Sequence, residues 1–249
     1  MLSDYLLLGA IGFVAQLVDG ALGMAFGVIS TSAMLTMGIP VAQASAVVHT
    51  AEIFTTAASA GSHIYHRNVD WKMVARLGTG GVLGAMLGAW ALSNVDGAAA
   101  RPYVAAYLLA LGIFILLKAA RQLPRSDAPF AWATPLGVVG GFLDASGGGG
   151  WGPMVASTLI GSGQAPRHAV GSVNTTEFFV TLAAATTFFI ELGIAPWQEL
   201  LALIVGGIVA APLGGWAVKH VPARMLMVMV GVLVVTLAAW QLARAFKLV

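Results

Sequence analysis

The stretch Asp144-Ala145-Ser146-Gly147-Gly148-Gly149-Gly150-Trp151-Gly152-Pro153 lies in the middle of an apolar segment that runs from Phe130 to Gly163. Four consecutive glycines are unfavourable in a helix interior, so a helix that enters this stretch is predicted to break. At about 1.5 Å per residue, the segment also exceeds a hydrocarbon core of about 30 Å by more than half. We therefore expect a broken helix or a re-entrant helical hairpin in place of one straight span.

A break of this kind has a chemical consequence. The second half of a broken helix starts with unpaired N–H groups and about half a positive charge, which together favour an anion. Glycines also let successive amides form a concave nest, and Pro153 suits the start of the second half-helix. The predicted anion site uses the amides of Gly147, Gly148, Gly149 and Gly150 beside Ser146. The alternative is that the glycines form a hinge or permit close packing.

The same pattern occurs twice. At a constant offset of 125 residues, Asp19 pairs with Asp144 and Glu52 with Glu177. Other pairs at this offset are Gly12 with Gly137, Gly23 with Gly148, Gly27 with Gly152, Ser32 with Ser157, Gly38 with Gly163, Thr50 with Thr175, Phe54 with Phe179 and Thr56 with Thr181. We predict an internal duplication with one half at residues 1–125 and the other at 126–249. The first half has fewer glycines, so its nest, from Gly23 to Gly27, is expected to be poorer.

Composition places these segments in a membrane. Of the 249 residues, 59% are hydrophobic and 9% are charged, whereas about a quarter of an average soluble domain is charged. The apolar segments run roughly over 5–38, 41–65, 73–92, 103–117, 130–163, 169–190, 200–218 and 225–242. We predict an all-α integral membrane protein of two homologous repeats, each with four helical segments, the first segment of each repeat being broken or re-entrant. The start of the chain lacks a basic region and a cleavage site, so the first segment is expected to be retained.

Other classes are disfavoured by composition. There are no cysteines, which excludes disulfides, thiolate metal sites and cysteine nucleophiles. The net charge of +2 does not suggest nucleic acid as a partner.

The two halves can be parallel or inverted. Four crossings per half give parallel repeats, whereas three crossings and a re-entrant hairpin give inverted repeats. The inverted arrangement puts most basic residues at one end of the bundle: Arg67, Lys72, Arg76, Lys118, Arg121, Arg125, Arg167, Lys219 and Arg224, against Arg101, Arg244 and Lys247. Since cytoplasmic loops are enriched in Lys and Arg, this distribution favours inverted repeats with both termini outside.

Four acids lie inside apolar segments, namely Asp19, Glu52, Asp144 and Glu177. Each charged carboxylate costs about 2.5–3.5 kcal/mol there on insertion scales. Because they occupy equivalent positions, the duplication is expected to bring them together about a pseudo-twofold axis. They are the candidates for proton coupling, since carboxyl groups away from water exchange protons more readily near neutral pH. The alternative is that each acid is hydrogen-bonded and only joins helices.

A polar stripe accompanies the acids on the second segment. Ser45, His49, Glu52, Thr56, Ser59 and His63 recur every three or four residues, and Asn174, Glu177 and Thr181 match them in the second half. We interpret the stripe as part of a transport pathway, with interhelical hydrogen bonding as the alternative. The neutral donors predicted for the anion are Ser146, His49, Thr50, Asn174 and Thr175.

Other chemistries fit the sequence less well. His63 and His66 are three residues apart, but no third ligand stands at helical spacing outside the stripe, so no metal and no cofactor are predicted. Asp19 and Asp144 suggest the dyad of an intramembrane protease, but the Gly-x-Gly-Asp signature is absent. Ser62 and His63 are adjacent and point about 100° apart on a helix, so they do not form a catalytic pair. The chain is not expected to be an enzyme.

With these features the chain resembles the sulfite exporter TauE/SafE family of membrane permeases. The resemblance covers almost the whole chain and depends on three features: the glycine-rich break from Ser146 to Pro153, the Ala- and Thr-rich helix with Glu52 or Glu177, and the loop Arg67-Asn68-Val69-Asp70-Trp71. The chain departs from the usual pattern at Gly20 to Gly27, which has lost most of the glycine run, and at Ala195-Pro196-Trp197.

The resemblance implies a secondary transporter in a bacterial inner membrane. It implies movement of sulfur-containing anions such as sulfite, thiosulfate, sulfate or organosulfonates, driven by protons. We expect the anion between the two breaks near the bilayer midplane, with protons and membrane lipid as the other partners and a homodimer as a candidate assembly. An anion channel and a membrane assembly subunit without transport activity are the alternatives.

Overall fold

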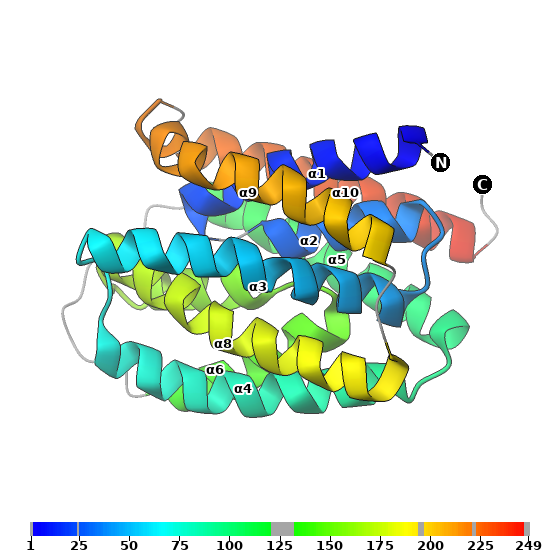
Figure 1. Cartoon of the computed structure of the whole chain (residues 1–249), viewed down its shortest axis with the longest axis horizontal. Coiled ribbons are helices and arrows are strands. Elements are labelled where there is room, and N and C mark those ends of the chain that lie inside the picture. The colour runs from blue at the N-terminus through cyan, green and yellow to red at the C-terminus, as the bar shows by residue number, and fades with distance from the viewer. Residues whose placement is uncertain (1, 24, 121–131, 194–196, 221–222, 247–249) are drawn as a thin grey trace.

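The computed structural model describes residues 2–23, 25–120, 132–193, 197–220 and 223–246. They form helices joined by short connections, as the apolar segments predict (Figure 1). The helices are α1 (Leu2–Leu22), α2 (Phe26–Thr36), α3 (Val41–Tyr65), α4 (Trp71–Ser93), α5 (Gly97–Ala119), α6 (Ala133–Gly147), a π-helical turn η1 (Gly152–Ala156), α7 (Ser157–Gly161), α8 (Pro166–Leu192), α9 (Trp197–His220) and α10 (Ala223–Ala245). The prediction of an all-α fold is confirmed.

Both long segments are broken at the predicted places. The first breaks between α1 and α2, where Gly23 has a φ of 67°. The second breaks between α6 and η1, where Gly148, Gly149 and Gly150 have φ values of 71°, 136° and 156°. Side chains disfavour these backbone angles, which is why the second break requires its glycines.

The two halves are interlocked through glycine faces. Helix α4 packs along α6 of the other half, and α1 packs along α9. A Cβ at Gly84 would lie 2.1 Å from the Val138 carbonyl oxygen, and one at Gly12 would lie 2.6 Å from the Leu203 carbonyl oxygen. In membranes the hydrophobic effect does not favour association of helices, because lipid tails are as apolar as the side chains. Close backbone approach by small residues favours it instead. Each half therefore completes the other's packing.

Contacts in the two halves correspond. Gly81 on α4 faces Trp151 after the second break, and Gly207 on α9 faces Phe26 after the first. In Figure 1, α3 runs from right to left and α8 from left to right, and α4 and α9 are likewise opposed. Helix α1 begins and α10 ends at the same end of the bundle. These directions support the predicted inverted duplication, which stays a prediction, as do the halves 1–125 and 126–249.

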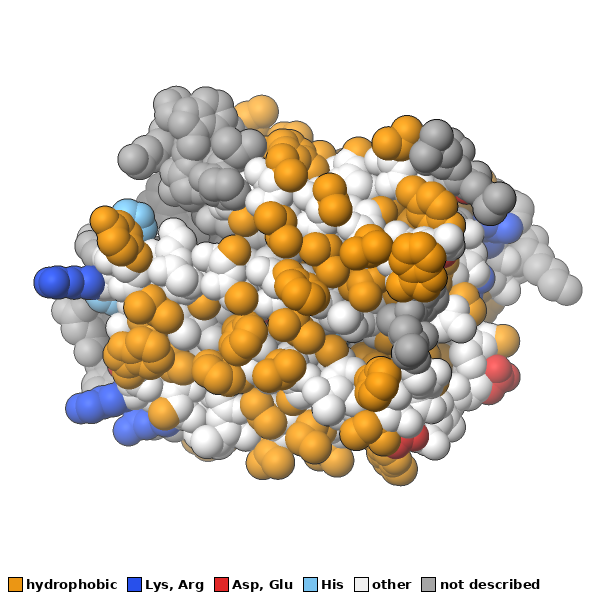
Figure 2. Space-filling model, in the orientation of Figure 1, with side chains coloured by type: hydrophobic (Ala, Val, Ile, Leu, Met, Phe, Trp, Pro, Cys, Tyr) orange, Lys and Arg blue, Asp and Glu red, His pale blue; other side chains and the backbone are white. Residues whose placement is uncertain are grey.

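The face shown in Figure 2 is apolar along the length of the bundle and charged at its two ends. Three helices of the described chain are long and apolar enough to cross a membrane: Gly97–Ala119, His168–Leu192 and Met227–Ala245. Basic side chains without acidic ones stand at the left end in Figure 2, where α3 ends and α4 begins, and this end is called the basic end; the right end shows both acidic and basic side chains. Arg121, Arg125 and Lys247, which entered the topology prediction, lie outside the described residues.

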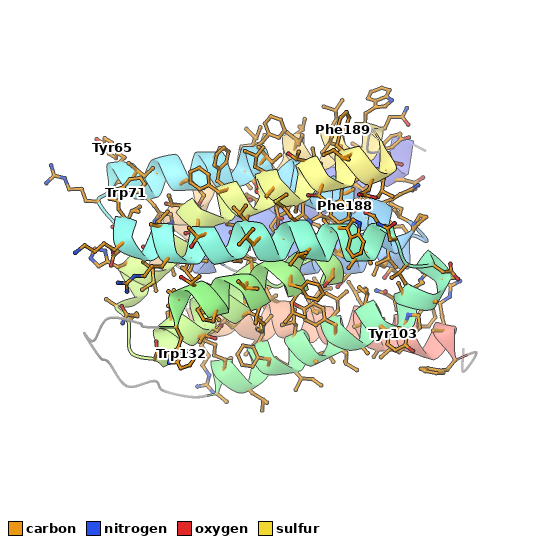
Figure 3. All side chains as sticks on the ribbon, turned by 90° about the horizontal axis from the view of Figure 1, so that it is seen from below. Tyr65, Trp71, Tyr103, Trp132, Phe188 and Phe189 are labelled. Atoms are coloured by element: carbon orange, nitrogen blue, oxygen red, sulfur yellow. The ribbon has the colours of Figure 1, made fainter. Side chains whose placement is uncertain are left out.

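Aromatic side chains mark the same ends. Tyr65, Trp71 and Trp132 lie at the basic end, and Tyr103 lies at the opposite end (Figure 3). All four are exposed. Aromatic rings at both ends of an apolar bundle are typical of membrane interfaces.

We predict that Gly84→Ala lowers the free energy of unfolding by about 1–3 kcal/mol, because the added methyl group forces α4 away from α6. The measurement is thermal unfolding of the purified protein in detergent. Gly61→Ala is the control: it also lies within a helix, and nothing lies within 4 Å of its Cβ position. Equal unfolding temperatures for the two variants would contradict the role of the glycine face.

Candidate functional site

The two breaks meet inside the bundle. A Cβ built on Gly27 would lie 2.9 Å from Gly149 Cα and 3.0 Å from Glu52 Oε1. A Cβ on Gly148 would lie 2.4 Å from Thr31 Cγ2. The glycine run of the second half therefore packs directly on the start of α2, with the Glu52 carboxyl group beside the junction.

An aspartate bridges each break in the same way. The Asp144 Oδ1 atom accepts from the Trp151 N–H at 2.9 Å, seven residues further along the chain. Asp19 Oδ1 accepts from the N–H of Phe26, also seven residues on, at 3.4 Å, and from that of Ala25 at 2.8 Å. A carboxylate at the start of a helix is stabilised by its unpaired amides and by the helix dipole. In both halves the aspartate before the break caps the helix after it.

The amides of the glycine run are partly paired within the chain, unlike those of the predicted anion nest. The N–H groups of Gly148 and Gly149 donate to the Asp144 main-chain carbonyl, the latter at 2.9 Å. The expectation that the break leaves its amides unpaired is therefore wrong for these two residues, because the chain folds back into a capping turn. The group that faces the start of the second half-helix in this structure is the protein's own Asp144 side chain.

His49 on α3 joins this aspartate to the polar stripe. Its Nε2 atom lies 3.2 Å from Asp144 Oδ2, and its Nδ1 atom lies 2.8 Å from the Ser45 carbonyl oxygen. The Ser45 hydroxyl in turn donates to the Ala145 carbonyl at 2.8 Å, which fixes α3 against the end of α6. Both His49 and Asp144 are buried, with 0% and 2% of their surface exposed.

The geometry sets the proton content of this pair. A carbonyl oxygen only accepts, so His49 Nδ1 carries a hydrogen. The contact between Nε2 and the Asp144 carboxyl then needs one further proton, held either by the histidine or by the aspartic acid. The pair is neutral in both arrangements, and loss of that proton leaves one negative charge.

The other three buried acids of the apolar segments lie near this pair. Asp19, Glu52, Asp144 and Glu177 are all buried, and their carboxyl groups are close enough to interact electrostatically. One carboxyl oxygen each of Glu52 and Glu177, Oε2, has no hydrogen-bond partner. Full ionisation would place four negative charges together away from water, which is energetically prohibitive.

The equivalent position in the second half is built differently. Asn174 replaces His49, and its Nδ2 atom lies 3.4 Å from His63 Nε2. The ring of Phe188, at the position equivalent to His63, lies 6.0 Å from the ring of His49. The Asn68 side chain extends the polar contacts of His63 at 3.3 Å. One side of the cluster thus has a polar connection toward the basic end of the bundle, and the other side is covered by an aromatic ring.

The hydroxyl groups expected to donate to an anion are engaged within their own helices. The hydroxyls of Ser146, Thr50 and Thr175 each donate to the carbonyl four residues earlier, at 2.6, 2.7 and 2.7 Å. Gly23 faces Asn174: a Cβ on this glycine would lie 3.3 Å from Asn174 Nδ2. The structure therefore brings His49, Asn174, the glycines and the four acids together, whereas the three hydroxyls do not donate toward the centre.

Two residues at the breaks, Tyr107 and Thr31, were not predicted from the sequence. The Tyr107 ring on α5 covers the glycine run, and its hydroxyl is buried without a partner. The Thr31 hydroxyl on α2 is also buried and unpaired beside Gly148. A tyrosine in the middle of an apolar segment, far from either interface, is a signal that could have identified the first of them.

An apolar helical bundle with two broken segments and a buried acidic cluster defines a multi-pass membrane protein with the architecture of a transporter. The family model described as sulfite exporter TauE/SafE matches residues 8–240. The chain is 44% identical over 230 residues to the probable membrane transporter protein YtnM of Bacillus subtilis (strain 168), a match that covers 89% of this chain and 77% of that protein. No solved structure matches the chain.

The chain therefore belongs to the sulfite exporter TauE/SafE family of membrane transporters, which confirms the resemblance. The predicted location in a membrane crossed several times is confirmed, and the bacterial inner membrane is consistent with the Bacillus relative.

We predict that Asp144→Ala lowers the free energy of unfolding by about 1–3 kcal/mol, because the buried Trp151 N–H loses its acceptor. Asp144→Asn is the matched control, since an amide oxygen can still accept from this N–H and the amide nitrogen can donate to His49. Thermal unfolding in detergent measures both. If Asn and Ala destabilise equally, the hydrogen bond across the break does not hold the two half-helices together.

Proposed function

We propose that the protein is a proton-coupled carrier of small sulfur-containing anions such as sulfite, thiosulfate, sulfate or an organosulfonate. The proposal depends on one observation: the buried Asp144 carboxyl group accepts from the Trp151 N–H after the glycine break, and its other oxygen lies 3.2 Å from His49 Nε2. Membership of the TauE/SafE family supports the class of substrate.

Competition for the start of the helix couples the two ligands. A helix start with about half a positive charge binds either the Asp144 carboxylate or a substrate anion. A protonated carboxyl group is a weaker acceptor and brings no negative charge. Uptake of a second proton, which leaves His49 and Asp144 both protonated, therefore releases the helix start for the substrate and removes the repulsion that an anion would meet. Anion and proton then cross together.

Glu52 and Glu177 extend this coupling to both halves. Glu52 Oε1 lies against Gly27 at the junction, and each glutamate has an unpaired carboxyl oxygen that a proton or a bound ligand can engage. Their protonation lowers the charge that a substrate at the breaks experiences. Asp19 is held by two amides of the first break, so the two half-sites present similar capped helix starts.

The predicted inverted repeats would permit the conformational change that moves the substrate from one side of the membrane to the other. Two halves of opposite direction that share one central site can exchange conformations, which opens the site to each side in turn. The polar contacts from Asn174 through His63 to Asn68 suggest that protons in this conformation reach the cluster from the basic end.

The first experiment measures uptake of labelled sulfite, thiosulfate and sulfate into proteoliposomes, with and without an imposed pH gradient. We expect saturable uptake of at least one anion that an inward proton gradient stimulates, and none into protein-free liposomes. Flux that is fast and independent of the pH gradient would favour a channel, and absence of flux for every anion would favour an assembly subunit or another solute.

The glutamates give a second prediction. Glu52→Gln and Glu177→Gln are expected to abolish stimulation by the pH gradient while the folded protein is retained, because an amide keeps the shape of the side chain but cannot exchange a proton. Monodispersity in detergent checks folding. Stimulation of wild-type size in both variants would show that the glutamates do not couple protons.

The internal duplication supplies a matched pair for His49. His49→Asn gives the first half the residue that the second half has, and we expect proton-stimulated uptake to fall about tenfold, equivalent to 1.4 kcal/mol, because the shared proton is lost. The control, Asn174→His, introduces a histidine at the equivalent position and is expected to retain the stimulation. Equal effects of the two changes would remove His49 from the mechanism.

A further inference from the structure

A cavity leads from the surface to the glycine run. It has a volume of about 290 Å³ and is lined by the end of α4, the start of α5 and the end of α6. Tyr103 and Val95, with 78% and 52% of their surface exposed, stand at its mouth, and Ser146 and Gly147 are at its inner end. Figure 3 shows Tyr103 at the end of the bundle opposite to Tyr65 and Trp71. The cavity therefore opens at the end where α1 begins and α10 ends.

Tyr107 separates this cavity from the junction of the breaks. It lines the cavity, and its ring lies over the glycines: a Cβ on Gly147 would lie 2.1 Å from Tyr107 Cε1, and one on Gly150 would lie 2.0 Å from its hydroxyl oxygen. On the other side of the run, Gly148 contacts Thr31 and Gly149 contacts Gly27. A solute in the cavity reaches the junction only if the tyrosine ring moves.

The hydroxyl group of Tyr107 is unsatisfied. It is buried and has no hydrogen-bond partner, although buried polar groups in proteins are nearly always paired. It also interacts electrostatically with Asp144, the carboxyl group that caps the second break. A tyrosine hydroxyl donates one hydrogen bond, and an anionic oxygen is the strongest acceptor it can meet. The unpaired donor at the inner end of the cavity thus points to an oxyanion as its partner.

We infer that this cavity is the aqueous route by which the anion reaches the glycine run from the end that carries the termini, and that Tyr107 both closes the route and donates to the anion as it passes. This inference rests on the proposed function for the identity of the solute. It adds a residue and a path that the acidic cluster does not contain.

A second cavity at the same end does not compete for this role. It has a volume of about 310 Å³ and is lined by Thr50, Phe188, Phe189 and Trp197, among others. Phe188 separates it from His49, and the hydroxyl of Thr50 is engaged with Ala46. Neither the glycine run nor an unpaired donor lies at its inner end.

The route can be tested without measuring transport, because the natural chain contains no cysteine. Ser146→Cys places a thiol in the cavity, outside Tyr107, and Thr31→Cys places one beyond it. The probes are a membrane-impermeant sulfonate methanethiosulfonate, which is itself an anion, and a lipid-soluble maleimide. Asn94→Cys, exposed at the end of α4, marks the side of the membrane on which the cavity opens.

We expect the impermeant reagent to modify Ser146→Cys from the same side as Asn94→Cys and to modify Thr31→Cys only slowly. Adding Tyr107→Ala should accelerate modification of Thr31→Cys at least about tenfold, since removal of the ring opens the route. Modification of Ser146→Cys by the maleimide alone would show a lipid-filled crevice. Modification of Thr31→Cys at an unchanged rate would show that Tyr107 closes nothing. Either result overturns the inference.

The donor role is tested by Tyr107→Phe, which removes only the hydroxyl. We expect a several-fold higher KM for the transported anion with an unchanged maximal rate, because an interaction with the entering anion is lost. Tyr103→Phe at the mouth is the matched control and should leave KM unchanged. An unchanged KM in Tyr107→Phe overturns the donor role.

The labelling results are independent of the substrate. If labelling behaves as expected and no sulfur anion is transported, the route stands and the proposed substrate fails. If transport occurs but labelling does not respond to Tyr107, the proposed function stands and this inference fails.

Discussion

The hydrogen bond from the Trp151 N–H to the Asp144 carboxyl group, with its counterpart between Phe26 and Asp19, is the interaction on which the rest of the structure depends. A helix broken inside a membrane leaves backbone groups that lipid cannot satisfy. An aspartate before the break supplies the acceptor from within the chain. The same bond places a carboxyl group in the middle of the bundle, at the position where the proposed proton coupling requires one.

The interlocked packing keeps this arrangement in place. Each broken helix lies against the glycine face of a helix from the other half, so that backbone meets backbone on α4 with α6 and on α1 with α9. The helix that packs along each broken segment thus comes from the other half of the chain. The breaks consequently meet each other at Gly27 and Gly149, and a change in the relative position of the halves must pass through this junction.

The two half-sites are equivalent in backbone and different in chemistry. His49 and Phe188 occupy one side of the cluster, and Asn174 and His63 occupy the other at equivalent positions. On the first side, the His49 ring contacts Asp144 and is covered by the ring of Phe188. The side with the asparagine continues through polar groups toward the basic end. The two half-sites thus share a backbone arrangement, whereas their side chains take separate parts in the proposed proton chemistry.

Much of the architecture could be predicted from the sequence. The breaks between α1 and α2 and between α6 and η1 follow from local backbone preference, and membrane helices follow from apolar length. The pairing of Asp19 with Asp144 and of Glu52 with Glu177 predicted a common acidic cluster. Each of these is a local or periodic property of the chain, and such properties can be recognised from the order of the residues alone.

Only the tertiary structure decided how the groups pair. The contact of His49 with Asp144, the capping of each break by its own aspartate, and the position of Tyr107 over the glycine run join residues of different helices or depend on how the chain folds back on itself. The sequence predicted free amides at the break because propensity shows where a helix ends and not which acceptor lies nearby. Hydrogen bonds between buried groups are sensitive to differences of a few tenths of an ångström in the donor–acceptor distance, and these distances are set only when the helices pack.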